Sequence, residues 1–458
     1  MAAWTEVMAS AVVAEDRFDG EYFSPSYLKM DAALSKIPKV EALGRLTHSL
    51  RKGIFDISPN RYRESGIPLV RTLQIKSPLL SRDSMTYIDV EDHERHFSKT
   101  ELVAGDIVFT KIGAGIGDVA VLPPDFDRYN FSQNVAGASL NRGKINGFYL
   151  LAYLATTWGR QQLLRYMMPS GQGKLELRDI KKLRIARFEN EEADISDLVV
   201  RSENALRNSR IKYADAQRLL DVELGMDKVT FQKPVGYVAN LSEALVSQRI
   251  DADYFQTPYR QIENHLNRYA TAQLGTLVGI AKGIEVGSGA YQAKGHPFLR
   301  VSNVKETGIE LGPSDKYISS ALYESLQIYR PQIGELLLTK DGTPGVAMAV
   351  DQECNGIVSG GVVRLKPKTD RIPIEYLALA INSRACKMQV QRECSGALIL
   401  HWKPASIRKL RVPILPTPTM DKIAALVSES KQARCKSEKL LEQAKARVEQ
   451  LIQEATQP

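Results

Sequence analysis

The sequence predicts an α+β protein made of two tandem α/β repeats, each followed by a long helix. The two helices are predicted to pair as an antiparallel coiled coil with pseudo-two-fold symmetry. Three observations support this prediction. A short motif occurs once in each half of the chain, and further matching segments follow it in the same order. Each half then closes on a helix with the same narrow stripe of small and apolar residues.

The repeated motif reads RFDGEYF at residues 17–23 and RIDADYF at residues 249–255. The matches continue along both halves, and the separation between partners shrinks only gradually. The matching pairs are LGRL (43–46) with LGTL (274–277), KGI (52–54) with KGI (282–284), GIPLVR (66–71) with GHPFLR (295–300), GDIVFTK (105–111) with GELLLTK (334–340), and KKLRI (181–185) with RKLRV (408–412). An ordered series of this kind indicates a duplication, so both halves are expected to share one fold.

The last segment of each half has the periodicity of a coiled-coil helix. Small or apolar residues recur at heptad spacing, and polar side chains cover the other faces. The residues predicted to pair are Ile195, Ser202, Ser209 and Ala216 in the first helix, and Ile423, Ser430, Ser437 and Ala444 in the second. Small side chains let two helix backbones approach closely, which favours pairing between the helices. The alternative is that each helix lies on its own domain.

Between the motif and the helix, each half contains short apolar runs typical of strands and longer helical patterns. Proline-containing segments mark boundaries at QKPVGYV (232–238) and LPTPT (415–419). The predicted order is a first globular domain at 1–189, a central long helix at 190–226, a second globular domain at 227–416 and a C-terminal long helix at 417–458.

The composition favours a polyanion partner. The 458 residues carry a formal net charge of +8, with a pI near 9.1, and the positive charge is distributed along the chain. The apolar runs are too short for a membrane span, and no basic segment precedes the first of them, so a cytoplasmic location is predicted. The four cysteines form no CxxC pair, which fits a reducing compartment and gives no zinc-binding pattern.

Two paired helices of this kind predict a mode of binding. Each spans about 30 residues, or roughly 45 Å at 1.5 Å per residue. An antiparallel pair relates the two domains by a pseudo-dyad, which is also the symmetry of duplex DNA. Two basic domains held at a fixed separation are therefore expected to contact two half-sites with an unread spacer between them. The half-sites are expected to differ because the domains differ in sequence.

Several of these segments resemble one known family. The pattern SxRxDAxYF, present in SEALVSQRIDADYF (242–255), the strand and small-residue loop in GELLLTKDGTPG (334–345), and the K-x-L-x-(I/V)P strand that leads into a helix are similar to the specificity subunit of type I restriction–modification systems. The resemblance covers nearly the whole chain, in both repeats. The chain departs from the family at the start of its first long helix, ENEEADISDL, where a proline-rich start is common.

The resemblance implies a non-catalytic subunit with two target-recognition domains, each reading one half of a bipartite site in double-stranded DNA. It also implies that the helices dock two adenine-N6 methyltransferase subunits and, in the full complex, ATP-dependent restriction subunits. The departure at the first long helix bears on how these partners dock more than on DNA recognition.

Candidate DNA-binding residues lie at strand ends and in loops that match between the halves. Guanidinium and amide groups read guanine and adenine edges, and lysines contact phosphates. The candidates are Arg71, Gln74, Lys111, Gln133, Asn134, Gln172 and Lys174 in the first half, and Arg300, Asn303, Lys340, Thr343, His401 and Lys403 in the second. Gln133 and Asn134 match Ser359 and Gly360 approximately. A structural salt bridge is an equal interpretation for Arg71 and Arg300.

The glycine-rich loop IGAGIGD (112–118) has three interpretations: a tight surface turn, a loop that brings backbone N–H groups near DNA phosphate, and a nucleotide cradle. It matches neither GxxxxGK[ST] nor GxGxxG. No catalytic or metal-binding motif was found in the sequence, so a non-enzymatic protein without a cofactor is predicted. The rival hypotheses are a repeated scaffold or adaptor with an incidental basic surface, and an enzyme with its site between the repeats.

Overall fold

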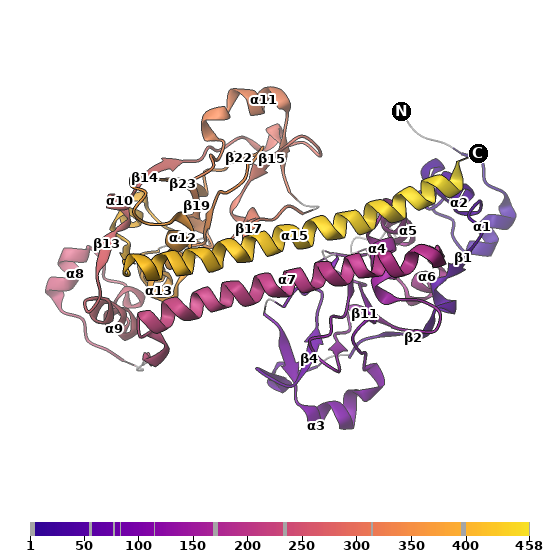
Figure 1. The fold of residues 1–458 in the computed structure, drawn as a ribbon, viewed down its shortest axis with the longest axis horizontal. Coiled ribbons are helices and arrows are strands. Elements are labelled where there is room, and N and C mark those ends of the chain that lie inside the picture. The colour runs from indigo at the N-terminus through magenta and orange to yellow at the C-terminus, as the bar shows by residue number, and fades with distance from the viewer. Residues whose placement is uncertain are drawn as a thin grey trace. The chain divides into compact units, whose positions relative to one another are not determined.

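The computed structural model describes residues 5–54, 57–76, 78–82, 84–113, 115–167, 173–231, 236–312, 315–394 and 400–457. Its contacts group the chain into two compact units. Unit 1 comprises Met1–Leu206 and Cys435–Pro458, and unit 2 comprises Arg207–Arg434. Both units mix strands with helices and include part of each long helix, which confirms the predicted α+β class (Figure 1). The predicted domain boundaries follow chain order, whereas the compact units cut across it because they share the long helices.

The main sheet of unit 1 carries apolar cores on both faces. Its strand order is β2-β11-β8-β9-β6-β5, with β2 at Thr47–Lys52, β5 at Ile75–Lys76, β6 at Leu79–Leu80, β8 at Ile107–Thr110, β9 at Val119–Val121 and β11 at Val135–Leu140. Strand β8 is fully buried, as its unbroken apolar run predicts. The pleat directs Ile107 and Phe109 into the core that contains helix α4 (Gly147–Ala155), while Val108 faces a second core.

A second sheet of unit 1 has the order β10-β4-β7-β3, with β3 at Tyr62–Arg63, β4 at Ile67–Val70, β7 at Thr86–Ile88 and β10 at Asn130–Phe131. Strands β10 and β4 are parallel, and the other pairs are antiparallel. Unit 1 also contains α1 (Ala9–Glu15), α2 (Pro25–Leu34), α3 (Val90–Asp92), α5 (Thr157–Tyr166), α6 (Leu177–Lys182) and the antiparallel pair of β1 (Val40–Ala42) with β12 (Arg184–Ala186).

Unit 2 repeats this arrangement. Its main sheet has the order β14-β23-β19-β21, with β14 at Val278–Lys282, β19 at Leu336–Thr339, β21 at Ala347–Ala349 and β23 at Val362–Pro367. Its second sheet has the order β18-β15-β22, with β15 at His296–Leu299, β18 at Tyr317–Ile318 and β22 at Ile357–Val358. Strands β15 and β22 are parallel, like β4 and β10. The recurring strand order supports the duplication inferred from the sequence.

Unit 2 further contains the helices α8 (Leu241–Ser247), α9 (Thr257–Leu266), α10 (Leu274–Leu277), α11 (Ser320–Ser325), α12 (Ile374–Asn382), α13 (Arg384–Glu393) and α14 (Pro404–Lys409). Its short strand pairs are β13 (Thr271–Gln273) with β25 (Arg411–Pro413), β16 (Val304–Lys305) with β17 (Gly308–Ile309), and β20 (Asp341–Gly342) with β24 (Leu400–His401).

Helices α7 (Glu189–Glu223) and α15 (Thr417–Thr456) pair antiparallel within each unit. In unit 1 the Ser202 hydroxyl donates to the backbone oxygen of Ser437 at 2.7 Å, and the two hydroxyls are 3.0 Å apart. In unit 2 the Ser430 hydroxyl donates to the backbone oxygen of Ser209 at 2.7 Å, with the hydroxyls 3.1 Å apart. The same contact is made once in each unit with the roles of the helices exchanged, which is the pattern that pseudo-two-fold pairing requires.

The residues predicted to pair are all buried. Ile195 and Ala444 join the large core of unit 1, whereas Ala216 and Ile423 join that of unit 2. Each helix segment therefore packs both on the other helix and on the strands and helices of its unit. Both alternatives drawn from the sequence, pairing between the helices and packing of each helix on a domain, are therefore present in the structure.

The repeated motif forms a turn that packs on helix α5 in unit 1. Arg17 pairs with Asp19 at 2.6 Å, and Asp19 accepts a hydrogen bond from the backbone N–H of Tyr22 at 3.1 Å. Arg165 donates to the backbone oxygen of Tyr22 at 2.9 Å, and its guanidinium lies 4.1 Å from the centre of the Tyr22 ring. The hydrogen bond from Arg17 holds the pKa of Asp19 below its usual value. Tyr22 and Phe23 are buried in the core.

Unit 2 builds the same turn from the same residue types. Arg249 pairs with Asp251 at 2.5 Å, and Asp251 accepts from the backbone N–H of Tyr254 at 3.2 Å. Arg392 of α13 donates to the backbone oxygen of Tyr254 at 3.1 Å, and Phe255 is buried. The motif therefore occurs twice because each unit uses it to attach its leading segment to the equivalent helix.

Candidate nucleic-acid interface

Three segments of unit 1 that the sequence singled out converge at the end of strand β8. The backbone N–H of Lys111 donates to the backbone oxygen of Asn134 at 2.8 Å. The backbone oxygen of Lys111 accepts from Leu175 at 3.0 Å, and Ile112 forms an antiparallel bridge with Lys174. Lys111, the loop of Gln133 and Asn134, and Lys174 therefore share one site. The remaining candidate of this group, Gln172, lies outside the described residues.

The site in unit 1 brings the charges of three lysines and one glutamate within range of one another. The Lys111 residue is 7% exposed, and no described residue accepts a hydrogen bond from its ammonium group. Burial lowers the pKa of Lys111, and the charges of Lys174 and Lys52 lower it further, with Glu176 acting in the opposite direction. Glu176 is itself paired with Lys174 at 2.6 Å. The carboxylate that acts on Lys111 is therefore shared with Lys174.

Unit 2 places the equivalent segments together in the same way. The backbone N–H of Lys340 donates to the backbone oxygen of Gly361 at 2.9 Å, and its backbone oxygen accepts from Trp402 at 2.8 Å. Asp341 pairs with His401 across strands β20 and β24. The side chains differ from those of unit 1. Lys340 forms an ion pair with Asp341, and the other oxygen of that carboxylate contacts the His401 ring at 2.8 Å.

The structure shifts the match between the two loops by one residue. Asn134 and Gly361 are equivalent, because each accepts the backbone hydrogen bond of the strand-end lysine. Gln133 therefore corresponds to Gly360 and not to Ser359. A Cβ on Gly360 would lie 2.3 Å from a carboxylate oxygen of Glu285, so the glycine leaves room for that side chain. Unit 2 thus places Glu285 against Gly360, next to the residue that accepts the backbone hydrogen bond of its strand-end lysine.

The amides of Gln74 and Asn303 hold turns and do not face solvent, which corrects their predicted place at a reading surface. Gln74 accepts from the backbone N–H of Arg71 at 3.1 Å and donates to the backbone oxygen of Ser84 at 3.3 Å. Asn303 accepts from the backbone N–H of Arg300 at 2.9 Å and donates to the backbone oxygen of Glu310 at 3.0 Å. Both residues are buried, at 0% and 1% exposure.

The two arginines of these turns are half-buried. The Arg71 side chain donates to the backbone oxygen of Ser84 at 2.9 Å. The Nε atoms of Arg71 and Arg300 are buried, and neither has a hydrogen-bond partner within the described structure. Thr343, His401 and Lys403 are exposed, so these candidates of unit 2 are accessible to a ligand.

The loop after β8 is a tight turn. The backbone N–H of Gly117 donates to the oxygen of Thr110 at 3.0 Å, and that of Asp118 donates to Gly115 at 2.8 Å. Gly113 and Gly117 have φ values of +119° and +78°, which favour glycine. The N–H groups of Gly117 and Asp118 are therefore used within the turn, which favours the surface-turn interpretation over the nucleotide cradle.

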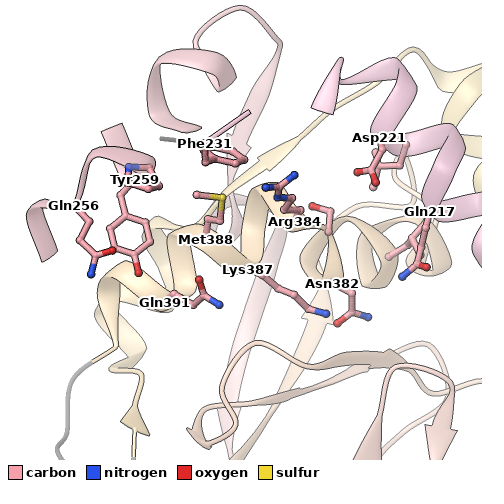
Figure 2. Close-up of a pocket in the computed structure, with 14 residues that line it drawn as sticks. Gln217, Asp221, Phe231, Gln256, Tyr259, Asn382, Arg384, Lys387, Met388 and Gln391 are labelled. Carbon is pink, nitrogen blue, oxygen red and sulfur yellow. The ribbon is translucent and has the colours of Figure 1, made fainter. Parts of the chain in front are cut away.

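A cavity of about 570 Å³ lies elsewhere in unit 2, between α7, α9 and α13. Figure 2 shows Phe231, Met388 and Arg384 grouped at its centre. The Arg384 guanidinium lies 4.4 Å from the centre of the Phe231 ring, and Lys387 is paired with Glu306. Burial raises the pKa of Asp221, the one carboxylate among the described lining residues. None of the candidate DNA-binding residues lines this cavity.

Lys52, Glu285 and Asp341 were not selected from the sequence. Lys52 stands in KGI, which both halves contain, so the repeat carried a signal for it. Asp341 and Glu285 could be found only through the fold, because their neighbours come from distant segments.

Within the described ranges, no group of three or more His, Cys, Asp or Glu could hold a metal ion. Across the same part of the chain, no helix has the length and apolarity to span a membrane.

A scan against models of protein families gave no match, and a search of curated proteins also gave none. A search of solved structures gave matches along most of the chain. The S subunit of a type I restriction–modification system from M. genitalium is 13% identical, with a TM-score of 0.42, over 92% of this chain and 96% of that chain. The HsdS subunit from Thermoanaerobacter tengcongensis is 15% identical, with a TM-score of 0.27, over 91% of this chain and 96% of that chain.

A chain from a structure on the assembly and conformational transition of the type I restriction–modification system is 16% identical. Its TM-score is 0.27, over 92% of this chain and 97% of that chain. Over more than nine-tenths of its length, the chain is thus similar to S subunits of type I restriction–modification systems.

Proposed function

We propose that this chain is the DNA sequence-recognition subunit of a type I restriction–modification complex, in which each unit reads one half of a bipartite, asymmetric site. One observation carries the proposal. Both units bring the same three segments together behind a strand-end lysine, but they surround it with different side chains. A shared backbone with different side chains suits two reading surfaces that select different bases.

The paired helices are proposed to set the distance between the half-sites and to dock two methyltransferase subunits. Their seam supports this role because its contacts recur with the helices exchanged, so two identical partners would meet equivalent surfaces. The partners would supply the transfer of the methyl group and, where they are present, the ATP-dependent restriction activity. The chain itself would act by binding.

The test is the methylation pattern that the chain directs. The full chain is expressed with the methyltransferase subunit from the same source in a host that lacks adenine methylation, and the host DNA is sequenced for N6-methyladenine. A split motif with an unread gap is expected, and it should vanish when the chain is omitted. A stable complex that adds no methylation would contradict the proposal and favour a scaffold.

A further inference from the structure

We propose that unit 1 contains a phosphate-binding site formed by Lys111, Lys174 and Lys52, and that unit 2 lacks its equivalent because Asp341 neutralises Lys340. The inference rests on the proposed function only for the identity of the natural ligand, a phosphodiester of the DNA backbone. The site itself is argued from the contacts within each unit.

The buried lysine is the first argument. Lys111 is 7% exposed, and its ammonium has no hydrogen-bond partner among the residues that the structure describes. An anion that reaches this ammonium would supply the hydrogen-bond acceptor and the negative charge that the described neighbours of Lys111 do not supply. The repulsion from Lys174 and Lys52 adds to the demand for negative charge, and burial adds its own lowering of the Lys111 pKa. The nearby carboxylate, Glu176, is already paired with Lys174.

The backbone holds these lysines in place. The N–H of Gly53, next to Lys52, donates to the backbone oxygen of Val135 at 3.2 Å. A Cβ on Gly53 would lie 2.1 Å from the backbone oxygen of Phe131, so this segment packs directly on strand β10. Lys174 is fixed by its bridge to Ile112. Strand pairing therefore places the backbones of Lys52, Lys111 and Lys174 at one end of strand β8.

The equivalent positions of unit 2 carry a different charge pattern. Lys282 and Lys340 stand where unit 1 has Lys52 and Lys111, but Asp341 replaces Ile112 and His401 replaces Lys174. Asp341 contacts both Lys340 and His401. The lysine of unit 2 thus has an internal anion.

The first experiment measures binding of inorganic pyrophosphate to the full chain by calorimetry, at constant ionic strength set with chloride. The apparent dissociation constant is expected to rise at least about tenfold in Lys111→Met, since a charge-assisted hydrogen bond is lost. The matched variant Lys340→Met should leave it unchanged. Absence of binding to the wild-type chain, or equal loss in both variants, would overturn the site.

Exchanging the residues at positions 112 and 341 between the units should remove pyrophosphate binding from unit 1 and create it in unit 2. Ile112→Asp supplies unit 1 with the internal anion of unit 2 and should abolish pyrophosphate binding there. Asp341→Ile removes that anion from unit 2 and should create a second binding event, which is absent in Asp341→Ile/Lys340→Met. Hydrogen–deuterium exchange of each unit verifies folding. Wild-type stoichiometry in both single variants would contradict the inference.

Duplex DNA links the site to the proposed function. With the methyltransferase complex and a duplex that carries its methylated motif, Lys111→Met should reduce the salt dependence of binding by about one phosphate contact. Pyrophosphate binding without any DNA binding would uphold the site and reject the proposed function. Sequence-selective DNA binding with an unaltered salt dependence in Lys111→Met would uphold the proposed function and reject the site.

Discussion

Replacing Arg82 with methionine is expected to lower the free energy of unfolding of unit 1 by about 3–5 kcal/mol. Arg82 contacts two carboxylates, Asp125 at 2.5 Å and Glu203 of helix α7 at 2.5 Å. The Arg82 and Asp125 side chains are each 19% exposed and that of Glu203 is 5% exposed, so water replaces little of the lost interaction. Removal of the guanidinium leaves two partly buried carboxylates side by side without a counter-charge.

The measurement is hydrogen–deuterium exchange across a urea titration, which reports each unit separately. Arg82→Met should destabilise unit 1 and leave unit 2 unchanged. The triple variant Arg82→Met/Asp125→Asn/Glu203→Gln should recover most of the loss because it removes both orphaned charges. Lys431→Met is the matched variant in unit 2. Lys431 occupies the repeat position of Glu203 and forms a longer pair with Asp351, at 3.4 Å, so a smaller effect is expected. A neutral effect of Arg82→Met would show that this network does not hold the segments after strands β6 and β9 on α7.

Ala444→Asp is expected to destabilise unit 1 by at least about 3–5 kcal/mol, since it buries an unpaired carboxylate. Ala444 is 0% exposed and belongs to the same apolar core as Ile195 and Val199 of helix α7. The substitution therefore tests whether the two helices are in contact along the small-residue stripe.

The chain offers matched controls for this substitution. Ala446 lies on the exposed face of the same helix, so Ala446→Asp should cost only the helix propensity difference, well under 1 kcal/mol. Ala216→Asp should have the large effect in unit 2, and Ala214→Asp, at an exposed position, the small one. The four variants are compared by the same exchange experiment. Similar losses of stability at the buried and the exposed positions would contradict the contact between the helices along the small-residue stripe.

The features that came from the sequence are those with a periodic or repeated signal. The doubled motif and the ordered matches indicate two similar modules, and the strand order recurs in both units. The heptad stripe selected Ser202 and Ser437, whose hydroxyls are 3.0 Å apart. Such signals are visible because burial and close helix contact restrict residue types at fixed spacing.

The site was predicted less completely because polar residues carry no such constraint. Gln74 and Asn303 have side chains suited to reading bases, but short-range hydrogen bonds to their own turns use them inside the fold. Asp341 lies next to a selected lysine in the sequence, yet its significance depends on His401, which a different segment contributes. The one-residue shift at Asn134 arises because loop lengths differ, and only strand pairing determines which residues are equivalent.

The most direct test of the central claim, that each unit reads its own half-site, is the methylome of a variant changed in one unit. Thr343, His401 and Lys403 of unit 2 are exposed, so their joint replacement with alanine should spare the core. The expected result is a split motif in which one half is relaxed or altered, while the other half and the length of the gap stay the same. An unchanged motif, or equal changes in both halves, would contradict the account.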